Sequence, residues 1–313
     1  MPMRAPTGEQ YELEFGDLTA TITQVAAGIR TLRYGGADLV EPFPEDATPP
    51  SADGIVLVPW PNRVKDGVWE LDGVPQRMAI TEPALGNASH GLLRFRPYAL
   101  VERSESAVTQ GATIYPEPGY PFVLDTTVTH ELDTEGLTVT HTVTNRSRRT
   151  APVAIGAHPY LRIGDVPPTQ LTLTVHAGTR FETDDRLNVV GETTVAGTAY
   201  DLSAGRIVAE LDLNDGFGDI PSPVEHTLAA ADGRTVTLWG DASFAYVQLF
   251  THRAFATKEA GEVALAVEPM TAPANALNTG RGLRWLEPGE TWTAQWGIRP
   301  RGFAGDSYLA SWG

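Results

Sequence analysis

Apolar and polar residues alternate with a period of two along most of the chain. The segments LTVTHTV (137–143), QLTLTVHA (170–177) and TVTLWG (235–240) follow this pattern, which is typical of strands with one buried face. VALAV (263–267) is instead a continuous apolar run, as expected for a strand that is buried on both faces. The pattern therefore predicts a chain built mainly of strands.

Turn-forming residues separate these strands. Asp-Gly dipeptides lie within WELDGVPQRMAI (69–80) and HTLAAADGRTVTLWG (226–240), in each case between apolar segments, and this arrangement is a strong hairpin signal. LDTEGLTV (132–139) and WLEPGETWTAQW (285–296) predict two further hairpins with slightly longer turns.

The chain has no pattern that predicts an amphipathic helix longer than two or three turns. Segments rich in proline and glycine predict long loops at 41–54, 164–169 and 214–224. Strands continue across every candidate boundary, with no low-complexity linker and no internal repeat. We therefore expect residues 1–313 to form one large all-β domain, an antiparallel sandwich.

Composition narrows the classes of function. The 313 residues include 39 acidic and 23 basic side chains, a net charge of −16. Such a surface repels phosphate backbones and anionic headgroups, so we expect neither a nucleic-acid nor a membrane partner. The sequence contains no cysteine, which excludes disulfides and thiolate nucleophiles. It also has no signal-peptide-like start and no run of ~18 apolar residues, so the expected location is cytoplasmic.

Motifs for metal, phosphate and nucleophile chemistry are missing. The seven histidines are not spaced as metal ligands, and the only lysines are Lys65 and Lys258. This leaves little room for Schiff-base chemistry or a phosphate-loop lysine. We therefore expect neither a metal nor a cofactor.

Two stretches place polar side chains beside residues that fix or free the backbone. In LVPWPNRVKDG (57–67), Asn62 and Arg63 follow two prolines, and a guanidinium held there can donate to hydroxyls or to a carboxylate. In GNASHGLLRF (86–95), glycines around His90 would let the backbone approach a ligand. Taken alone, the first stretch also fits a loop arginine paired with a surface acid, and the second an ordinary turn.

Two further stretches end predicted strands with an ionisable residue before a proline. GAHPYLRIG (156–164) contains His158, suited to general-acid work near neutral pH, and Tyr160 two residues later. LAVEPMTAPANALN (265–278) contains Glu268 at the end of an apolar run, where a carboxylate needs a partner or a function. The structural alternatives are a buried histidine that bonds the backbone and a glutamate that pairs with an arginine.

In their order along the chain, these motifs resemble the aldose 1-epimerase (galactose mutarotase) family. The resemblance rests on PWPNR, the following VWELDG hairpin, NASHG, AHPYL and AVEPMTAPANAL, and it covers roughly residues 15 to 300. It is strongest to the aldose 1-epimerase-like proteins of bacteria. The resemblance implies a single β-supersandwich, no cofactor, and an isomerase that interconverts the α and β anomers of a free hexose such as glucose or galactose.

The resemblance also implies roles for individual residues. Glu268 would be the base that takes the proton from the C1 hydroxyl, and His158 would be the acid that protonates the ring oxygen. We expect Glu268 to be ionised and His158 to be able to carry a proton, with Arg63 helping to keep the carboxylate charged if it lies close. The positions matched to substrate binding are Asn62, Arg63, His90, Tyr160, Asn214 and Gln248.

One position departs from the family pattern. The family usually has an aspartate three residues before a phenylalanine, and LNDGFGDI (213–220) has Asn214 there, with Asp215 next to it. Either Asn214 takes the role, since an amide both donates and accepts, or the loop is shifted by one residue and Asp215 takes it.

The sequence leaves other functions open. A hexose-phosphate mutarotase would share the acid and the base and add an arginine cluster, for which Arg94 and Arg96 are candidates. A non-catalytic carbohydrate-binding protein would need neither His158 nor Glu268, and a glycoside hydrolase would usually need a second carboxylate. The expected partner is a small sugar, and the sequence does not decide between a monomer and a homodimer.

Overall fold

The computed structural model describes residues 4–258 and 262–303. Nearly all of its regular structure is antiparallel strand, and the only α-helix within these residues is the short α1 (Ala276–Thr279). Short 3-10 turns occupy Pro50–Ala52, Lys65–Gly67, Pro168–Gln170 and Val208–Glu210. The prediction of an all-β chain is confirmed.

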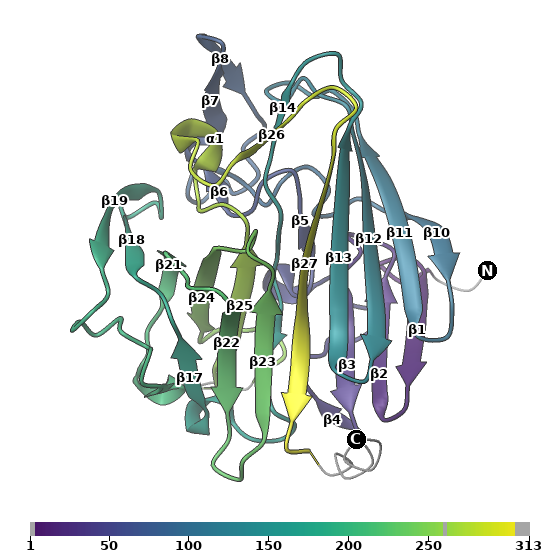
Figure 1. The fold of residues 1–313 in the computed structure, drawn as a ribbon, viewed down its shortest axis with the longest axis vertical. Helices are drawn as coiled ribbons and strands as arrows, with labels where there is room; N and C mark the ends of the chain where they lie inside the picture. Colours follow the sequence, from purple (N-terminus) through teal and green to yellow (C-terminus); the bar gives the residue numbers. More distant parts are fainter. Residues whose placement is uncertain (1–3, 259–261, 304–313) are drawn as a thin grey trace.

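A nine-stranded sheet forms one layer of the sandwich (Figure 1). In spatial order its strands are β10 (Ala99–Arg103), β11 (Ala107–Ile114), β12 (Leu124–Asp133), β13 (Gly136–Asn145), β27 (Thr291–Arg301), β23 (Thr235–Gly240), β22 (Val224–Ala229), β17 (Thr172–Val175) and β20 (Arg206–Ile207). In β13, buried and half-buried residues alternate, as the sequence pattern of 137–143 predicts.

Two other sheets pack against this layer. An eight-stranded sheet runs in the order β19 (Val189–Thr194), β18 (Thr179–Thr183), β21 (Asn214–Gly218), β24 (Tyr246–His252), β25 (Ala264–Met270), β15 (Gly156–Ala157) and β5 (Val56–Leu57), with β16 (Tyr160–Leu161) also paired to β25. A four-stranded sheet consists of β1 (Gln10–Phe15), β2 (Leu18–Thr23), β3 (Ile29–Tyr34) and β4 (Ala37–Asp38). Every residue of β25 is buried, which confirms the interpretation of the apolar run.

Three two-stranded ribbons complete the fold. They pair β14 (Ala151–Val153) with β26 (Arg284–Leu286), β6 (Arg63–Val64) with β9 (Ala88–Ser89), and β7 (Val68–Leu71) with β8 (Val74–Arg77).

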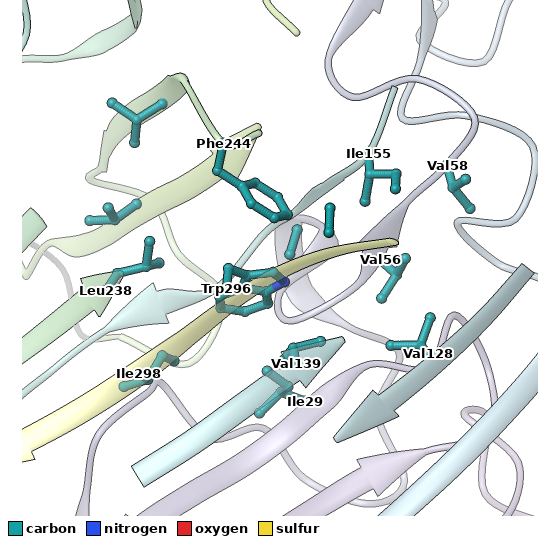
Figure 2. Close-up of a cluster of buried hydrophobic side chains, with 14 of the residues drawn as sticks. Ile29, Val56, Val58, Val128, Val139, Ile155, Leu238, Phe244, Trp296 and Ile298 are labelled. Atoms are coloured by element: carbon teal, nitrogen blue, oxygen red, sulfur yellow. The ribbon is translucent and has the colours of Figure 1, made fainter. Parts of the chain in front are cut away.

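The main core lies between these sheets. Figure 2 shows Trp296 of β27 among apolar side chains that include Ile29 of β3, Val56 of β5, Val128 of β12 and Leu238 of β23, all of them buried. One apolar cluster therefore draws on the four-, eight- and nine-stranded sheets, and burial of this surface is the main force that holds the layers together.

Most of the predicted hairpins are present. β7 and β8 meet at the Asp-Gly turn, β22 and β23 are joined across 230–234, and β12 pairs with β13 through a shorter turn than predicted. The hairpin predicted at 285–296 is wrong, because β26 pairs with β14 whereas β27 pairs with β13 and β23. The loop predicted at 214–224 is also partly wrong, because β21 occupies its first half between β18 and β24.

Candidate active site

Strands β24 and β25 place the first two polar residues of the site. They pair in antiparallel register, with Gln248 directly opposite Glu268. Because successive side chains of a strand alternate between its faces, Phe250 and His252 lie on the same face of β24 as Gln248. Gln248 and Glu268 are both buried, so this register fixes an amide beside a carboxyl group.

His158 lies where β15 gives way to β16. The following Pro159 has no N–H to donate to a neighbouring strand, so the ladder is interrupted there. The backbone is still satisfied, since the His158 N–H donates to the carbonyl of Ile55 and the Gly54 N–H donates to the carbonyl of His158. The imidazole is therefore carried on a fixed backbone.

The acid and the base predicted from the sequence are in contact. His158 Nε2 lies 3.3 Å from Glu268 Oε1, and the two residues are 5% and 2% exposed. Their other polar atoms, Nδ1 of His158 and Oε2 of Glu268, have no hydrogen-bond partner among the described residues. Since buried polar groups are normally paired, these two atoms leave hydrogen-bonding capacity unsatisfied at the acid–base pair.

Burial shifts the pKa of both groups toward their neutral forms. It lowers the pKa of His158 to about 4, with nearby positive charge adding to the effect. It raises the pKa of Glu268 to about 8, against the opposing influence of Arg63. The expectation that Glu268 is ionised near neutral pH is therefore wrong, because the loss of hydration on burial outweighs the attraction of Arg63. Between about pH 4 and pH 8 the pair as a whole holds one proton.

A chain of amides extends from this pair. Asn62 Nδ2 donates to Gln248 Oε1 at 3.3 Å, and Gln248 Nε2 donates to Asn214 Oδ1 at 3.0 Å. Asp215 takes the opposite face of β21 and pairs with Arg180 at 2.6 Å. Asn214 thus lines the cavity while Asp215 is engaged elsewhere.

Arg63 reaches the same cavity but is already paired. Its Nε and Nη2 donate to the two carboxylate oxygens of Glu82 at 2.7 and 2.9 Å, and its Nη1 donates to Asn62 Oδ1 at 3.3 Å. Arg63 therefore fits both interpretations of the sequence, since it is paired with an acid and also lines the cavity. The fork geometry fixes the guanidinium, and Glu82 offsets its charge.

The backbone is strained where Asn62 and His90 meet. Both have left-handed conformations, with φ of 54° and 63°, and the His90 N–H donates to the Asn62 carbonyl at 2.9 Å. Non-glycine residues in this region are unfavourable and tend to mark functional sites. The next residue, Gly91, has φ of 73°, and a Cβ there would lie 2.1 Å from the Val58 carbonyl oxygen, so only glycine fits.

Aromatic side chains surround His158. The His90 ring meets it edge-on at 5.4 Å and the Tyr160 ring stacks on it at 5.2 Å between centroids. The Tyr160 hydroxyl donates to the carbonyl of Ser51 at 3.4 Å. Burial, together with the neighbouring His158, lowers the pKa of His90 well below its usual value, so His90 is neutral and can both donate and accept.

These residues enclose a cavity of about 400 Å³. It is lined by every predicted site residue: Asn62, Arg63, His90, His158, Tyr160, Asn214, Gln248 and Glu268. Arg94 also lines it, where its Nη1 and Nη2 donate to Ser89 Oγ and the Thr81 carbonyl, whereas Arg96 does not. The sequence reasoning missed Ser51, Glu82, Phe250 and His252, of which the last two follow from alternation along β24.

Four other histidines lie outside the cavity: the exposed His176 and three that are buried. His130, His141 and His226 are buried in the strands of the nine-stranded sheet, where burial lowers the pKa of each to about 3 or 4. Within the described residues, no group of three or more His, Asp or Glu side chains is arranged to hold a metal ion. In the same part of the chain, no helix has the length and apolarity needed to cross a bilayer.

Comparison with known proteins gives a consistent pattern. The aldose 1-epimerase family profile matches residues 9–299. The Escherichia coli (strain K12) protein YihR, itself uncharacterized, is 32% identical over 292 residues, which is 91% of each chain.

Solved structures resemble this fold at lower identity. A GalM/aldose epimerase homologue from C. elegans superimposes with a TM-score of 0.82 at 20% identity, covering 95% of this chain and 99% of that one. A galactose 1-epimerase from Lactobacillus acidophilus NCFM gives 0.76 at 17% identity, covering 93% and 94%.

Proposed function

The chain belongs to the aldose 1-epimerase family, and from its site geometry we propose that it is a mutarotase that interconverts the α and β anomers of a free hexose such as glucose or galactose. The observation that carries the proposal is the contact of 3.3 Å between His158 and Glu268 in the lining of a polar cavity. An acid and a base in one buried pair are what the opening of a hemiacetal ring requires.

Ring opening moves two protons and breaks one bond. Glu268 takes the proton of the C1 hydroxyl, the O1 electrons form the C1=O1 double bond, and the C1–O5 bond breaks. His158 Nε2–H gives its proton to O5. After rotation about the C1–C2 bond, the same steps in reverse close the ring on the other face of C1.

The pair holds one proton throughout this cycle. Transfer of the Glu268 proton to His158 across their contact turns the neutral pair into carboxylate and imidazolium, which is the form that opens the ring, and after opening both groups are neutral again. Burial favours the neutral form, so it stabilises the half of the cycle that contains the open-chain aldehyde. The direct contact supplies the attraction that the ion pair needs in a low-dielectric cavity.

The other cavity residues would bind hydroxyls. Asn62, Gln248 and Asn214 present a row of amides that both donate and accept. Arg63 would add fixed donors, and its pairing with Glu82 reduces its attraction for an anion. A neutral sugar therefore suits this wall of the cavity.

Substitution of the pair tests the proposal. Glu268→Gln and His158→Ala should each slow mutarotation of glucose or galactose, followed by polarimetry, by about 10²- to 10⁴-fold. The exposed Glu70 and His176 provide matched controls as Glu70→Gln and His176→Ala, which should keep the wild-type rate. If either cavity variant, correctly folded, retains the wild-type rate, the assignment of roles is wrong.

The alternatives give different results in the same assay. A carbohydrate-binding protein would bind the sugar and leave its spontaneous mutarotation rate unchanged. A hexose-phosphate mutarotase would act faster on glucose 6-phosphate than on glucose. Arg94 is the one cavity residue that favours the phosphate alternative, but its Nη1 and Nη2 already bond Ser89 and Thr81, so we expect glucose to be the better substrate.

A further inference from the structure

Ser51 and His252 form a second polar group at the rim of the cavity, across Tyr160 from the acid–base pair. His252 Nε2 lies 2.8 Å from Ser51 Oγ, and both residues line the cavity. A serine beside a histidine raises the question of whether the histidine activates a nucleophile or orients a donor.

The direction of the hydrogen bonds answers this question. The backbone N–H of Ala254 donates to Nδ1 of His252 at 3.2 Å, so Nδ1 is an acceptor and carries no hydrogen. In the neutral imidazole the hydrogen is then on Nε2, which donates it to Ser51 Oγ. In a Ser-His nucleophile pair the polarity is opposite, because Nδ1–H donates and Nε2 accepts the serine proton. His252 therefore cannot act as the base for Ser51.

The same polarity leaves the Ser51 hydroxyl as a donor. Its oxygen already accepts from His252, and within the described residues its hydrogen has no protein acceptor. The backbone is also fixed: Ser51 is in the left-handed region with φ of 50°, and its carbonyl accepts from the Tyr160 hydroxyl. His252 thus orients the Ser51 hydroxyl, and Tyr160 holds the backbone that carries it.

Strand register shows which part of the substrate this donor meets. Glu268 lies opposite Gln248, whereas His252 is four residues further along β24 on the same face. The Tyr160 ring lies 5.2 Å from the His158 ring and 6.4 Å from the His252 ring between centroids. The reacting carbon must lie at Glu268. The Ser51 hydroxyl, which lies beside the Tyr160 hydroxyl and His252, therefore faces a sugar oxygen other than O1.

From this geometry we propose that Ser51 is a specificity-determining residue that donates a hydrogen bond to the substrate oxygen on C3, C4 or C6, and that His252 positions it. The inference rests on the proposed function, since it takes C1 to lie at the acid–base pair. It assigns Ser51 to binding and not to the proton transfers, so its removal should alter KM and leave kcat unchanged.

A deoxy-sugar series tests the contact. Ser51→Ala should raise KM for glucose about two- to fivefold, the loss expected for one partly exposed neutral hydrogen bond, with kcat unchanged. The KM of wild type and Ser51→Ala should be equal for one of 3-deoxyglucose, 4-deoxyglucose and 6-deoxyglucose, whichever lacks the partner oxygen. With 2-deoxyglucose the two proteins should still differ, as with glucose. Ser203→Ala, outside the cavity, is the control and should change nothing.

His252 variants test the positioning role. His252→Phe should reproduce the KM effect and its dependence on the deoxy position, whereas His252→Gln, which retains an N–H donor, should restore most of the affinity. A change in kcat alone, an equal effect on every deoxy sugar, or no effect of Ser51→Ala would each overturn the inference.

Calorimetric binding of glucose separates this inference from the proposed function. If wild type binds glucose but does not catalyse mutarotation, the proposed function fails, and weaker binding by Ser51→Ala would still support the contact. If wild type is catalytic and Ser51→Ala binds and turns over glucose as wild type does, only the inference about Ser51 fails. If glucose does not bind at all, both fail.

Discussion

Replacing Glu268 with glutamine should stabilise the protein increasingly as the pH rises. The carboxyl group is buried, and its Oε2 has no hydrogen-bond partner in the described part of the chain. Its pKa is raised from 4.5 to about 8 in the folded protein by burial. Glutamine has nearly the same shape and does not titrate, so a comparison of the two proteins isolates the ionisation of this group.

The sign and the size follow from proton linkage. Between pH 4.5 and about 8 the unfolded chain releases this proton while the folded chain retains it, so the wild type loses stability as the pH rises. The full shift corresponds to at most about 5 kcal/mol at 1.36 kcal/mol per pKa unit. Over the part of the range from pH 6.5 to 8, the advantage of Glu268→Gln should grow by about 2 kcal/mol, which is about 4 °C in Tm.

Thermal unfolding of both proteins between pH 6.5 and 9 measures this difference. That window lies above the range in which His158 contributes, since its pKa of about 4 in the folded state lies below its usual value of 6.5. Above pH 8 the difference should level off. The exposed Glu70→Gln is the control and should show no trend. A difference between Glu268→Gln and wild type that is constant across the window would refute the assignment of a buried, neutral carboxyl group.

Three further outcomes are expected. Because the active pair of His158 and Glu268 holds one proton, a plot of kcat/KM for mutarotation against pH should be bell-shaped, falling below about pH 4 and above about pH 8. A profile that falls on one side only would contradict this. Arg186→Ala should raise KM severalfold with little change in kcat. The reason is that Arg186 donates to the carbonyls of Leu85 and Gly86 and so holds its neighbour Leu187 at the cavity. If Arg186→Lys keeps the wild-type KM, one of these hydrogen bonds is enough to hold Leu187 in place. Gly91→Ala should lower Tm or prevent folding, since its Cβ would overlap a backbone carbonyl, and a wild-type melting curve would contradict the close approach of Gly91 to Val58.

Local patterns predicted the elements whose partners are close in sequence. The Asp-Gly turn at 72–73 determines the β7–β8 hairpin by its own conformation. The segment 285–296 contains similar turn chemistry, yet its two strands pair with different sheets. The partners of these two strands are distant in sequence, so the turn residues between them do not determine which strands they pair with.

The site shows the same division. The identity and order of the motifs sufficed to name His158 and Glu268, and one-residue alternation along β21 separates Asn214 from Asp215 once the strand is known. The ionisation of Glu268 could not be predicted, because it depends on how completely the surrounding sheets exclude water. Ser51 was missed because its place in the cavity arises from a contact with His252, 201 positions away.

The pairing of β24 with β25 also bears on how this protein tolerates insertions and deletions. Gln248, Phe250 and His252 share one face of β24, and a shift of one residue in that strand would turn all three away from the cavity and bring their neighbours in. Point substitutions here alter one contact at a time, whereas a single inserted or deleted codon would exchange the whole wall. Length variation among related sequences should therefore be confined to the connections outside these two strands, and a library that varies chain length should be built there.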